Sequence, residues 1–404
     1  MTEARQVMKY INSFLDSVVR PRAHTFRHTL SGFRVCAYLG LLASASLCVL
    51  LIMHLRLSLW IVPVLALCVG VSFAVLAMAT KILVGVEKLV FYHQTIFILV
   101  ICGTVLWLIG QPLASYLDVL ALSIGAFHVS ARIGCLLASC CHGKPSRYGV
   151  SYQAALTRNG FPLYLVGVRL FPIQLVESLW VLGITIVGTV LVLQGSQPGE
   201  ALAWYILVYA AGRFFFEFMR GDAERPYFWG FSEAQWTSLV LVYAVVLAEL
   251  AGMFVFHLSH VVGAAIVTAT MLGLIAKRKL SDGDTHKLLL PAHIKELALA
   301  IAANRETNGS GKVKVRCTSL GLRISTSHIK TSKQDIDLYT LSLTKRELTA
   351  ATARRLADLL LRLRPAASNE LIQGKHGVFH LLLRPYVDGS DGHRKLGLPG
   401  AGPV

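Results

Sequence analysis

Charged side chains are scarce in this chain of 404 residues: Asp, Glu, Lys and Arg make up only 15%, against 54% hydrophobic residues. The mean hydropathy of +0.59 is too high for an ordinary soluble enzyme. The composition also excludes an intrinsically disordered chain, and the presence of only 8 cysteines excludes a small disulfide-rich secreted domain. It indicates a protein that crosses a membrane several times.

Acidic residues are few, 22 against 39 basic ones, which gives a formal net charge of +17. The sequence has no zinc finger, helix-turn-helix pattern or aromatic-basic platform, so we expect no nucleic-acid partner and attribute the basic excess to attraction to anionic membrane lipid. The first thirty residues also lack the apolar run of a cleavable signal peptide. We therefore expect the first membrane span to direct insertion.

Apolar runs long enough to cross a bilayer as helices begin near residue 35. They are expected at 35–53, 59–79, 90–110, 116–139, 171–193, 201–219 and 235–256, with a shorter eighth at 260–276. The predicted fold is an all-α polytopic membrane protein of seven or eight transmembrane helices. The eighth stays open, because residues 235–276 would also fit one span and a re-entrant piece. Fourteen basic residues lie on the side of the N-terminus and of the loops at 80–89, 140–170 and 220–234, but only Arg56 on the other, so the positive-inside rule predicts a cytoplasmic first side.

Two flanking regions differ from this apolar body. Residues 1–34 form a basic segment with apolar residues at helical spacing, which predicts a helix in the membrane interface or, alternatively, a disordered leader. The body at 35–279 is followed by a small soluble α+β domain at 280–390, with strands at 313–317, 322–324, 336–341 and 378–382. Thr344 and Glu347 resemble a capping box that opens a helix to about Leu363. Residues 391–404, rich in Gly and Pro, are expected to be disordered.

Ionisable residues inside the spans are costly and therefore mark candidate functional sites. They are expected to gather near the loops of one face, together with His93 at the end of a span: Arg132, Glu177, Arg213, Glu217 and Glu249. Arg213, Glu217 and Arg220 stand at i, i+4 and i+7, so on one helix Glu217 could hold both guanidinium groups ready for a phosphate. A buried ion pair that only joins two helices is the alternative.

A second cluster of polar residues lies around the loop at 140–170. Arg132 precedes a cysteine-rich turn that ends at Gly143, and Pro172 opens a helix with Gln174 and Glu177 on one face. A pocket in the membrane lined by arginine, glutamine, glutamate and histidine would suit a phospholipid head group. These residues are therefore our candidates for a lipid site.

Residues 85 to 245 resemble the prolipoprotein diacylglyceryl transferases of bacterial inner membranes. The similar segments are Arg132-Ile133-Gly134, Gly143, Pro172 to Glu177, the run from Arg213 to Arg220 and the turn from Ser232 to Gln235. The run from Arg213 to Arg220 is the most specific of them. The essential histidine of the family is most similar to His93.

The resemblance implies transfer of a diacylglyceryl group from phosphatidylglycerol to the lipobox cysteine of a prolipoprotein, in a multi-pass protein of the bacterial inner membrane. It implies that Arg132 and Arg213 bind the phosphodiester, that Glu217 and Arg220 orient Arg213, and that His93 accepts the thiol proton. Residues expected to bind substrate are Gly134, Gly143, Gln174, Glu177, Glu217 and Arg220. The signal peptide of the prolipoprotein and membrane lipid are the implied partners. The family also faces the motif side outward, opposite to the charge-based prediction.

The chain departs from the family where the signature reads Asn-Phe-Ile-Asn-Gly-Glu and this sequence has Cys135 to Cys140, with Ala138 at an amide position. Alanine cannot make the hydrogen bonds of those amides. A non-catalytic phospholipid-binding protein, or a member with another acceptor, is therefore the alternative. Because the spacing of Cys135, Cys140, Cys141 and His142 matches no recognised zinc pattern, we expect no metal ion and no cofactor, with a metal or redox role as a further alternative.

Overall fold

The computed structural model of the chain describes residues 3–19, 22–24, 29–85, 91–280, 283–307, 313–330 and 335–384. The expected disordered tail at 391–404 lies outside these residues, and the expected domain boundaries stay predictions.

Eight helices in the described residues are long and apolar enough to cross a membrane. They are α2 (Gly32–His54), α3 (Ile61–Val84), α4 (Phe91–Leu108), α5 (Leu113–Leu137), α6 (Ile173–Leu193), α7 (Glu200–Phe216), α8 (Glu233–Leu250) and α9 (Leu258–Leu280). Each expected span is confirmed, and the open case at 235–276 is resolved as two helices. The protein is therefore a multi-pass membrane protein.

Helix α5 lies at the centre of the bundle, where it packs against α2, α4, α6 and α7. Small residues allow this close packing, since a Cβ on Gly125 would overlap Thr185 of α6 and one on Gly134 would lie 3.2 Å from Cys36 of α2. Asp118 of α5 accepts hydrogen bonds of 2.7 Å from the backbone N–H groups of Gly199 and Leu202. A carboxylate thus caps the N-terminus of α7 within the bundle.

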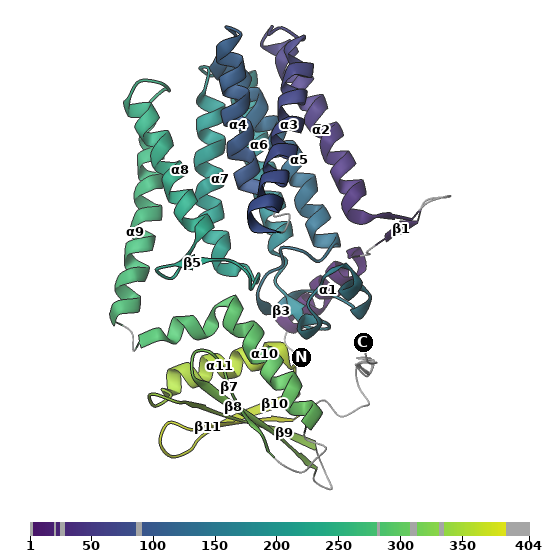
Figure 1. Cartoon of the computed structure of the whole chain (residues 1–404), viewed down its shortest axis with the longest axis vertical. Coiled ribbons are helices and arrows are strands. Elements are labelled where there is room, and N and C mark those ends of the chain that lie inside the picture. The colour runs from purple at the N-terminus through teal and green to yellow at the C-terminus, as the bar shows by residue number, and fades with distance from the viewer. Residues whose placement is uncertain are drawn as a thin grey trace.

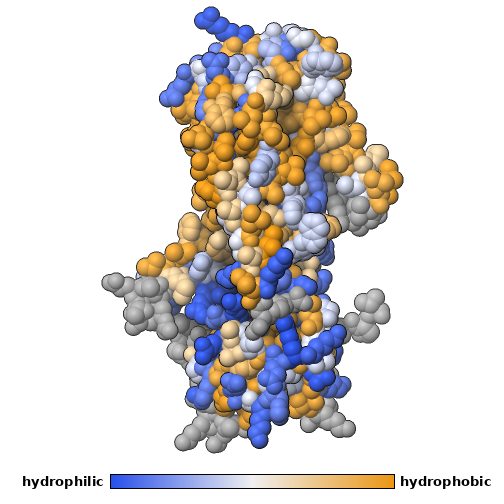
Figure 2. All heavy atoms as spheres, turned by 90° about the vertical axis from the view of Figure 1, so that its left-hand side faces the viewer, coloured by the Kyte–Doolittle hydropathy of each residue, from blue (hydrophilic) through white to orange (hydrophobic). Residues whose placement is uncertain are grey.

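An even number of spans brings both flanking regions to the same end of the bundle as the loops that carry the candidate site. Figure 1 shows α1, β3, β5 and the C-terminal sheet below the helices, and short connections at the opposite end. On the face drawn in Figure 2, apolar side chains cover most of the helical body and hydrophilic ones gather between it and the C-terminal region. The apolar surface matches a bilayer-facing belt.

The site end is built from short elements between the spans. β3 (Pro145–Ser151) pairs antiparallel with β4 (Arg169–Leu170), and η1 (Ala154–Asn159) and η2 (Leu163–Leu165) lie between them. β5 (Tyr227–Phe228) pairs with β6 (Phe231–Ser232) between η3 (Glu217–Met219) and α8. β1 (Arg22–His24) and β2 (Thr29–Ser31) precede α2.

The N-terminal segment is helical from Glu3 to Val18 (α1), which confirms the expected helix. Its polar face is fixed to the strands β3 and β4: Asn12 accepts from the N–H of Gly149 at 2.9 Å, and Asp16 accepts from the N–H of Ser151 at 3.0 Å. Asp16 also pairs with Arg169 at 3.0 Å. The opposite face stays exposed and apolar, with Val7, Tyr10, Ile11, Phe14 and Val18. A place in the membrane interface stays a prediction.

The C-terminal region is an α+β unit, as expected. It contains η4 (Gly283–Leu289), α10 (Pro291–Thr307), α11 (Ala350–Leu363) and a five-stranded antiparallel sheet. The sheet order is β10 (Ser368–Gln373), β11 (Phe379–Arg384), β9 (Asp335–Leu343), β8 (Leu322–Lys330) and β7 (Val315–Cys317).

The predicted capping box at Thr344 and Glu347 is wrong. Helix α11 begins six residues later than Thr344, at Ala350, and its N-cap is Thr349, whose hydroxyl accepts from the N–H of Thr352. Thr344 instead donates its hydroxyl to the carbonyl of Gly321 at 2.9 Å, which joins it to the turn before β8. Thr344 is thus a residue type common at helix N-caps whose hydroxyl instead forms a hydrogen bond across a turn.

Candidate functional site

Glu177, in the first two turns of α6, is fully buried and lies where three arginines converge. Its carboxylate lies 2.8 Å from Nη2 of Arg132, 3.4 Å from Nη1 of Arg220 and 3.9 Å from Nε of Arg213. α5, α6, α7 and the turn after α7 therefore meet at one carboxylate. The expectation that these residues gather at one face is confirmed for this group.

Glu217, at the end of α7, holds two guanidinium groups, but the second is not Arg220. Arg213 Nη1 lies 2.6 Å from Glu217 Oε2, and Arg225 Nη1 lies 2.9 Å from Oε1. The α-helix ends at Phe216, and Arg220 has extended backbone angles. The predicted i, i+7 relation is therefore wrong, because the shared stripe ends before Arg220.

Asp222 joins the two halves of this network. It lies 2.8 Å from Arg220 Nη2 and 3.0 Å from Arg225 Nε. Burial alone would raise the pKa of Asp222, but the guanidinium groups of Arg220 and Arg225 lower it below its ordinary value.

The group defined by Arg132, Arg213, Arg220, Arg225, Glu177, Glu217 and Asp222 is named the arginine network below. It holds four guanidinium groups and three carboxylates, so it carries one positive charge in excess. Several of its buried donors lie at ion-pair distance yet have no hydrogen bond of acceptable geometry within the described residues: Arg213 Nε, Arg213 Nη1 and Arg220 Nη2. Of these three, Arg213 Nε lies farthest from a carboxylate, 3.9 Å from Glu177, whereas Arg213 Nη1 and Arg220 Nη2 lie 2.6 Å and 2.8 Å from Glu217 and Asp222. Excess positive charge with a planar donor free to turn to an anion is what a phosphodiester would satisfy.

His93 lies at the start of α4, at the same end of the bundle, and is half-exposed. Its Nε2 is 2.9 Å from Oε1 of Glu233, the first residue of α8. The interactions described for His93 do not include Arg132 or Arg213. His93 therefore forms a half-exposed pair with the carboxylate of Glu233, outside the arginine network. Its role as a base stays a prediction.

The two candidate glycines act through backbone packing. A Cβ on Gly143 would overlap the carbonyl oxygen of Phe171, and Gly143 forms a β-bridge with Arg220. Gly134 faces α2 at Phe33 and Cys36. Gly143 thus fixes the backbone of a network arginine, whereas Gly134 allows two helices to approach.

Gln174 lies in the first turn of α6 and orders the cysteine-rich turn. Its Nε2 donates to the carbonyl of Cys140 at 2.8 Å, while its buried Oε1 has no hydrogen-bond partner within the described residues. The amide therefore keeps an acceptor that a substrate donor could use.

Sequence reasoning missed His128, Arg225 and Asp222. His128 is buried one turn before Arg132 on α5 and accepts a hydrogen bond of 2.9 Å from Arg132 Nε. Its i−4 position was a readable signal for a contact of this kind. Arg225 and Asp222 lie in a loop without helical periodicity, so no spacing rule could place them.

The turn between α7 and α8 is fixed close to the network by a capping box. The hydroxyl of Ser232 accepts from the N–H of Gln235 at 3.3 Å, and Gln235 Oε1 accepts from the N–H of Ser232 at 3.0 Å. Gln235 Nε2 also donates to the carbonyl of Phe214 at 3.3 Å. The Ser232–Gln235 segment therefore joins the start of α8 to the last turn of α7, which carries Arg213.

Glu249 does not belong to this site. It lies in the last turn of α8, at the opposite end of the bundle, and pairs with His260 of α9. The expectation that Glu249 joins the other charged residues is wrong, because consecutive spans run in opposite directions. Its contact is a buried pair between two helices.

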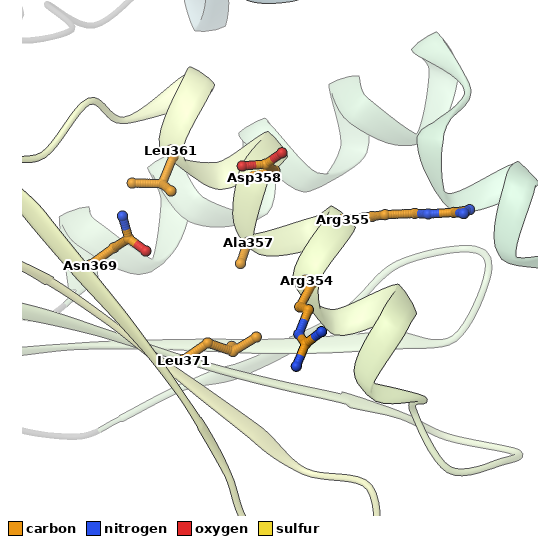
Figure 3. Close-up of a pocket in the computed structure, with 7 residues that line it drawn as sticks. All are labelled: Arg354, Arg355, Ala357, Asp358, Leu361, Asn369 and Leu371. Atoms are coloured by element: carbon orange, nitrogen blue, oxygen red, sulfur yellow. The ribbon is translucent and has the colours of Figure 1, made fainter. Parts of the chain in front are cut away.

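A separate hollow of about 330 Å³ lies in the C-terminal region between α11 and β10 (Figure 3). Arg354 of α11 points toward the sheet, where Asn369 and Leu371 of β10 lie, whereas Asp358 of α11 points away from it. Asp358 pairs with Arg147 of β3 at 3.0 Å, and Arg362 Nη1 donates to the carbonyl of Pro145 at 3.4 Å. α11 therefore contacts the strand β3, which follows the cysteine-rich turn.

Comparison with known proteins adds to this geometry. Residues 68–250 match the family model described as prolipoprotein diacylglyceryl transferase. The chain is 36% identical over 97 residues to phosphatidylglycerol--prolipoprotein diacylglyceryl transferase 2 of Clostridium perfringens, covering 22% of this chain and 34% of that protein. It is 27% identical over 144 residues to phosphatidylglycerol--prolipoprotein diacylglyceryl transferase of Clostridium tetani, and this match covers 36% of this chain and 53% of that protein. The matches thus span about a third and about half of these relatives.

Proposed function

Because residues 68–250 match the family model described as prolipoprotein diacylglyceryl transferase, we propose that this chain transfers the diacylglyceryl group of phosphatidylglycerol to the lipobox cysteine thiol of a prolipoprotein. Both relatives are named phosphatidylglycerol--prolipoprotein diacylglyceryl transferases. The thiol sulfur forms a bond to the terminal glyceryl carbon, the carbon–oxygen bond to phosphate breaks, and glycerol phosphate leaves with the electron pair. The thiol proton passes to a base.

The arginine network is the observation that carries the proposal. The leaving group gains charge as the carbon–oxygen bond breaks, and preorganised donors aimed at that charge lower the barrier. Arg213 Nε is buried, lies 3.9 Å from Glu177 and has no hydrogen bond within the described residues. Arg132 and Arg220 lie on the same carboxylate. We assign the phosphodiester to Arg132 and Arg213.

The remaining residues position these groups. Glu177 and Glu217 hold the guanidinium planes, Arg225 and Asp222 support Glu217 and Arg220, and Gly143 fixes the backbone beside Arg220.

The thiol proton needs an acceptor at the same end of the bundle. The His93–Glu233 pair supplies a histidine whose Nε2 is oriented by a carboxylate, which is the arrangement of an activated base. We therefore assign the thiol proton to His93.

We further propose that the protein resides in a bacterial inner membrane and takes the prolipoprotein by its signal peptide. Eight spans and an apolar belt support a membrane-embedded site. Phosphatidylglycerol reaches such a site from the bilayer itself.

The test is transfer from phosphatidylglycerol vesicles containing the purified protein to a lipobox peptide, measured as the mass of the thioether product. Arg213→Ala is expected to reduce transfer by at least a hundredfold, as loss of a donor at a developing charge does elsewhere. Arg158→Ala is the control, because Arg158 is exposed in η1 and outside the network. Wild-type protein that forms no thioether would contradict the proposal.

The substitutions at Cys135, Ala138 and Cys140 favour one second candidate, a phospholipid-binding protein without catalysis. It predicts phosphatidylglycerol binding that Arg213→Ala weakens, with no thioether under any condition. The same vesicle assay with a lipid-binding readout distinguishes the two functions.

A further inference from the structure

Three sulfur atoms converge at the end of α5, beside the arginine network. The ligand atoms of Cys135, Cys140 and Cys141 all lie within 4.8 Å of one another. Cys135 lies in the last turn of α5, and the other two follow the end of the helix. Within the described residues this is the group of cysteine, histidine and carboxylate side chains that could hold a metal ion.

The backbone explains how adjacent cysteines can share one centre. Ser139 and Cys141 have φ angles of 59° and 53°, in the left-handed region that side-chain-bearing residues rarely adopt. Two such residues around Cys140 fold the chain back beneath Cys135. The turn is held by Gln174, which binds the carbonyl of Cys140, and by Gly221, whose N–H donates to the carbonyl of His142 at 2.9 Å.

The cluster is open on one side. Cys140 is exposed and Cys135 and Cys141 are half-buried. Two residues beyond Cys141, Gly143 forms the bridge to Arg220, so the sulfurs and the arginine network share one connected turn. A ligand that reached the open side would therefore stand near Arg220, which shares the carboxylate of Glu177 with Arg132 and Arg213.

Zinc bound by thiolates at about 2.3 Å needs sulfur atoms roughly 3.8 Å apart in a tetrahedron. The three sulfur atoms lie within 4.8 Å of one another, which is within about 1 Å of this separation. Structural zinc sites close with four protein ligands, whereas catalytic sites keep three and leave the fourth position for a substrate. A zinc ion also holds a bound thiol in its thiolate form.

We propose that Cys135, Cys140 and Cys141 bind a Zn²⁺ ion whose open fourth position takes the thiol of the acceptor cysteine. This inference rests on the proposed function. The acceptor thiol binds zinc and releases its proton to His93 or to water. Its sulfur then forms the bond to the glyceryl carbon while the carbon–oxygen bond to phosphate breaks. The thioether product has lost its charge and leaves the metal.

The first experiment measures the zinc content of the full chain, purified in detergent and dialysed against metal-free buffer. One zinc ion per chain is expected. Cys140→Ser and Cys135→Ser should each reduce the content at least tenfold, while Cys317→Ser, at an exposed cysteine of β7, leaves it unchanged. Far-ultraviolet circular dichroism of each variant checks folding. No zinc in folded wild type, a disulfide within the cluster, or zinc retained by both cluster variants overturns the proposal.

The second experiment reads the fourth position directly. Protein loaded with Co²⁺ should show thiolate-to-cobalt absorption, and a lipobox peptide with cysteine, but not the same peptide with serine, should change the cobalt ligand-field bands. Unchanged bands overturn the proposal. Full transfer by zinc-free protein would overturn the metal site and leave the proposed function intact. If the protein binds zinc and the cysteine peptide changes the cobalt bands, but no diacylglyceryl group is transferred, the zinc site is supported and the proposed function is contradicted.

Discussion

Arg225 Nη1 lies 2.9 Å from Oε1 and 3.0 Å from Oε2 of Glu217, so a residue of the α7–α8 loop grips both oxygens of a carboxylate at the end of a transmembrane helix. Oε2 of the same carboxylate also lies 2.6 Å from Arg213 Nη1. The position of Arg213 therefore depends on a loop as well as on its own helix. The orientation of Arg213 is therefore fixed in part by a residue outside the membrane spans.

Arg225→Lys is expected to lower transfer about tenfold while the protein stays folded. Lysine keeps the charge but cannot contact both oxygens of Glu217 and Asp222 at once. Transfer rate at saturating peptide is the measurement, and Arg158→Lys, at an exposed position, is the control. A rate equal to wild type would mean that the loop contact does not set the geometry of Arg213.

Glu177→Gln is expected to be the most damaging single change in the arginine network. It leaves Arg132 and Arg220 buried without their shared carboxylate, and removing one partner of a buried pair costs about 3–5 kcal/mol. The measurement is the thermal unfolding midpoint in detergent, together with transfer. Glu224→Gln provides the matched control, because Glu224 is exposed in the loop after α7. Equal unfolding midpoints for the two variants would contradict the central role of Glu177.

Gly143→Ala is expected to destabilise the protein by about 1–3 kcal/mol, the range for atoms inserted into a packed region. The added methyl group would overlap the carbonyl oxygen of Phe171 and displace the strand that bridges to Arg220. Gly183→Ala in α6 is the control, because nothing lies within 4 Å of its Cβ position and alanine favours the helix. Unfolding midpoints of the two variants should therefore shift in opposite directions from that of the wild type.

Helical periodicity and hydropathy were sufficient to predict the spans, because a helix in lipid must satisfy its backbone internally and needs a minimum apolar length. Arg132, Glu177, Arg213 and Glu217 were identified for the same reason, as charges where charges are costly. The partners Arg225 and Asp222 could not be predicted, since a loop has no period that fixes which way its side chains point. The early end of α7 at Phe216 likewise removed Arg220 from the expected stripe. The contacts of Arg132, Arg213 and Arg220 with Glu177 could not be predicted either, because they depend on how three helices pack against one another.

The ion pairs of Asp222 predict that the protein loses stability at low pH. The pKa of Asp222 is lowered in the folded protein, so its contribution to stability is fully present above its unfolded pKa of about 3.9 and is lost as pH falls through the lower folded value. Unfolding midpoints should therefore fall below pH ~4, with no effect of this group between about pH 5 and 8. Asp222→Asn should reduce that fall. A pH dependence identical to wild type would show that other carboxylates control it.

An even number of spans predicts that Cys140, near the arginine network, and Cys317, in the C-terminal sheet, lie on the same side of the membrane. Gln197→Cys, in the exposed turn between α6 and α7, should introduce a thiol on the other side. Spheroplasts containing variants with a single accessible cysteine are treated with a membrane-impermeant maleimide before or after permeabilisation. Cys140 and Cys317 should label under the same condition, and the thiol introduced at position 197 under the opposite one. Labelling of Cys140 without permeabilisation would agree with the outward orientation that the family resemblance implies. Labelling only after permeabilisation would agree with the cytoplasmic orientation that the positive-inside rule predicts. Separate behaviour of Cys140 and Cys317 would contradict α9 as a membrane span.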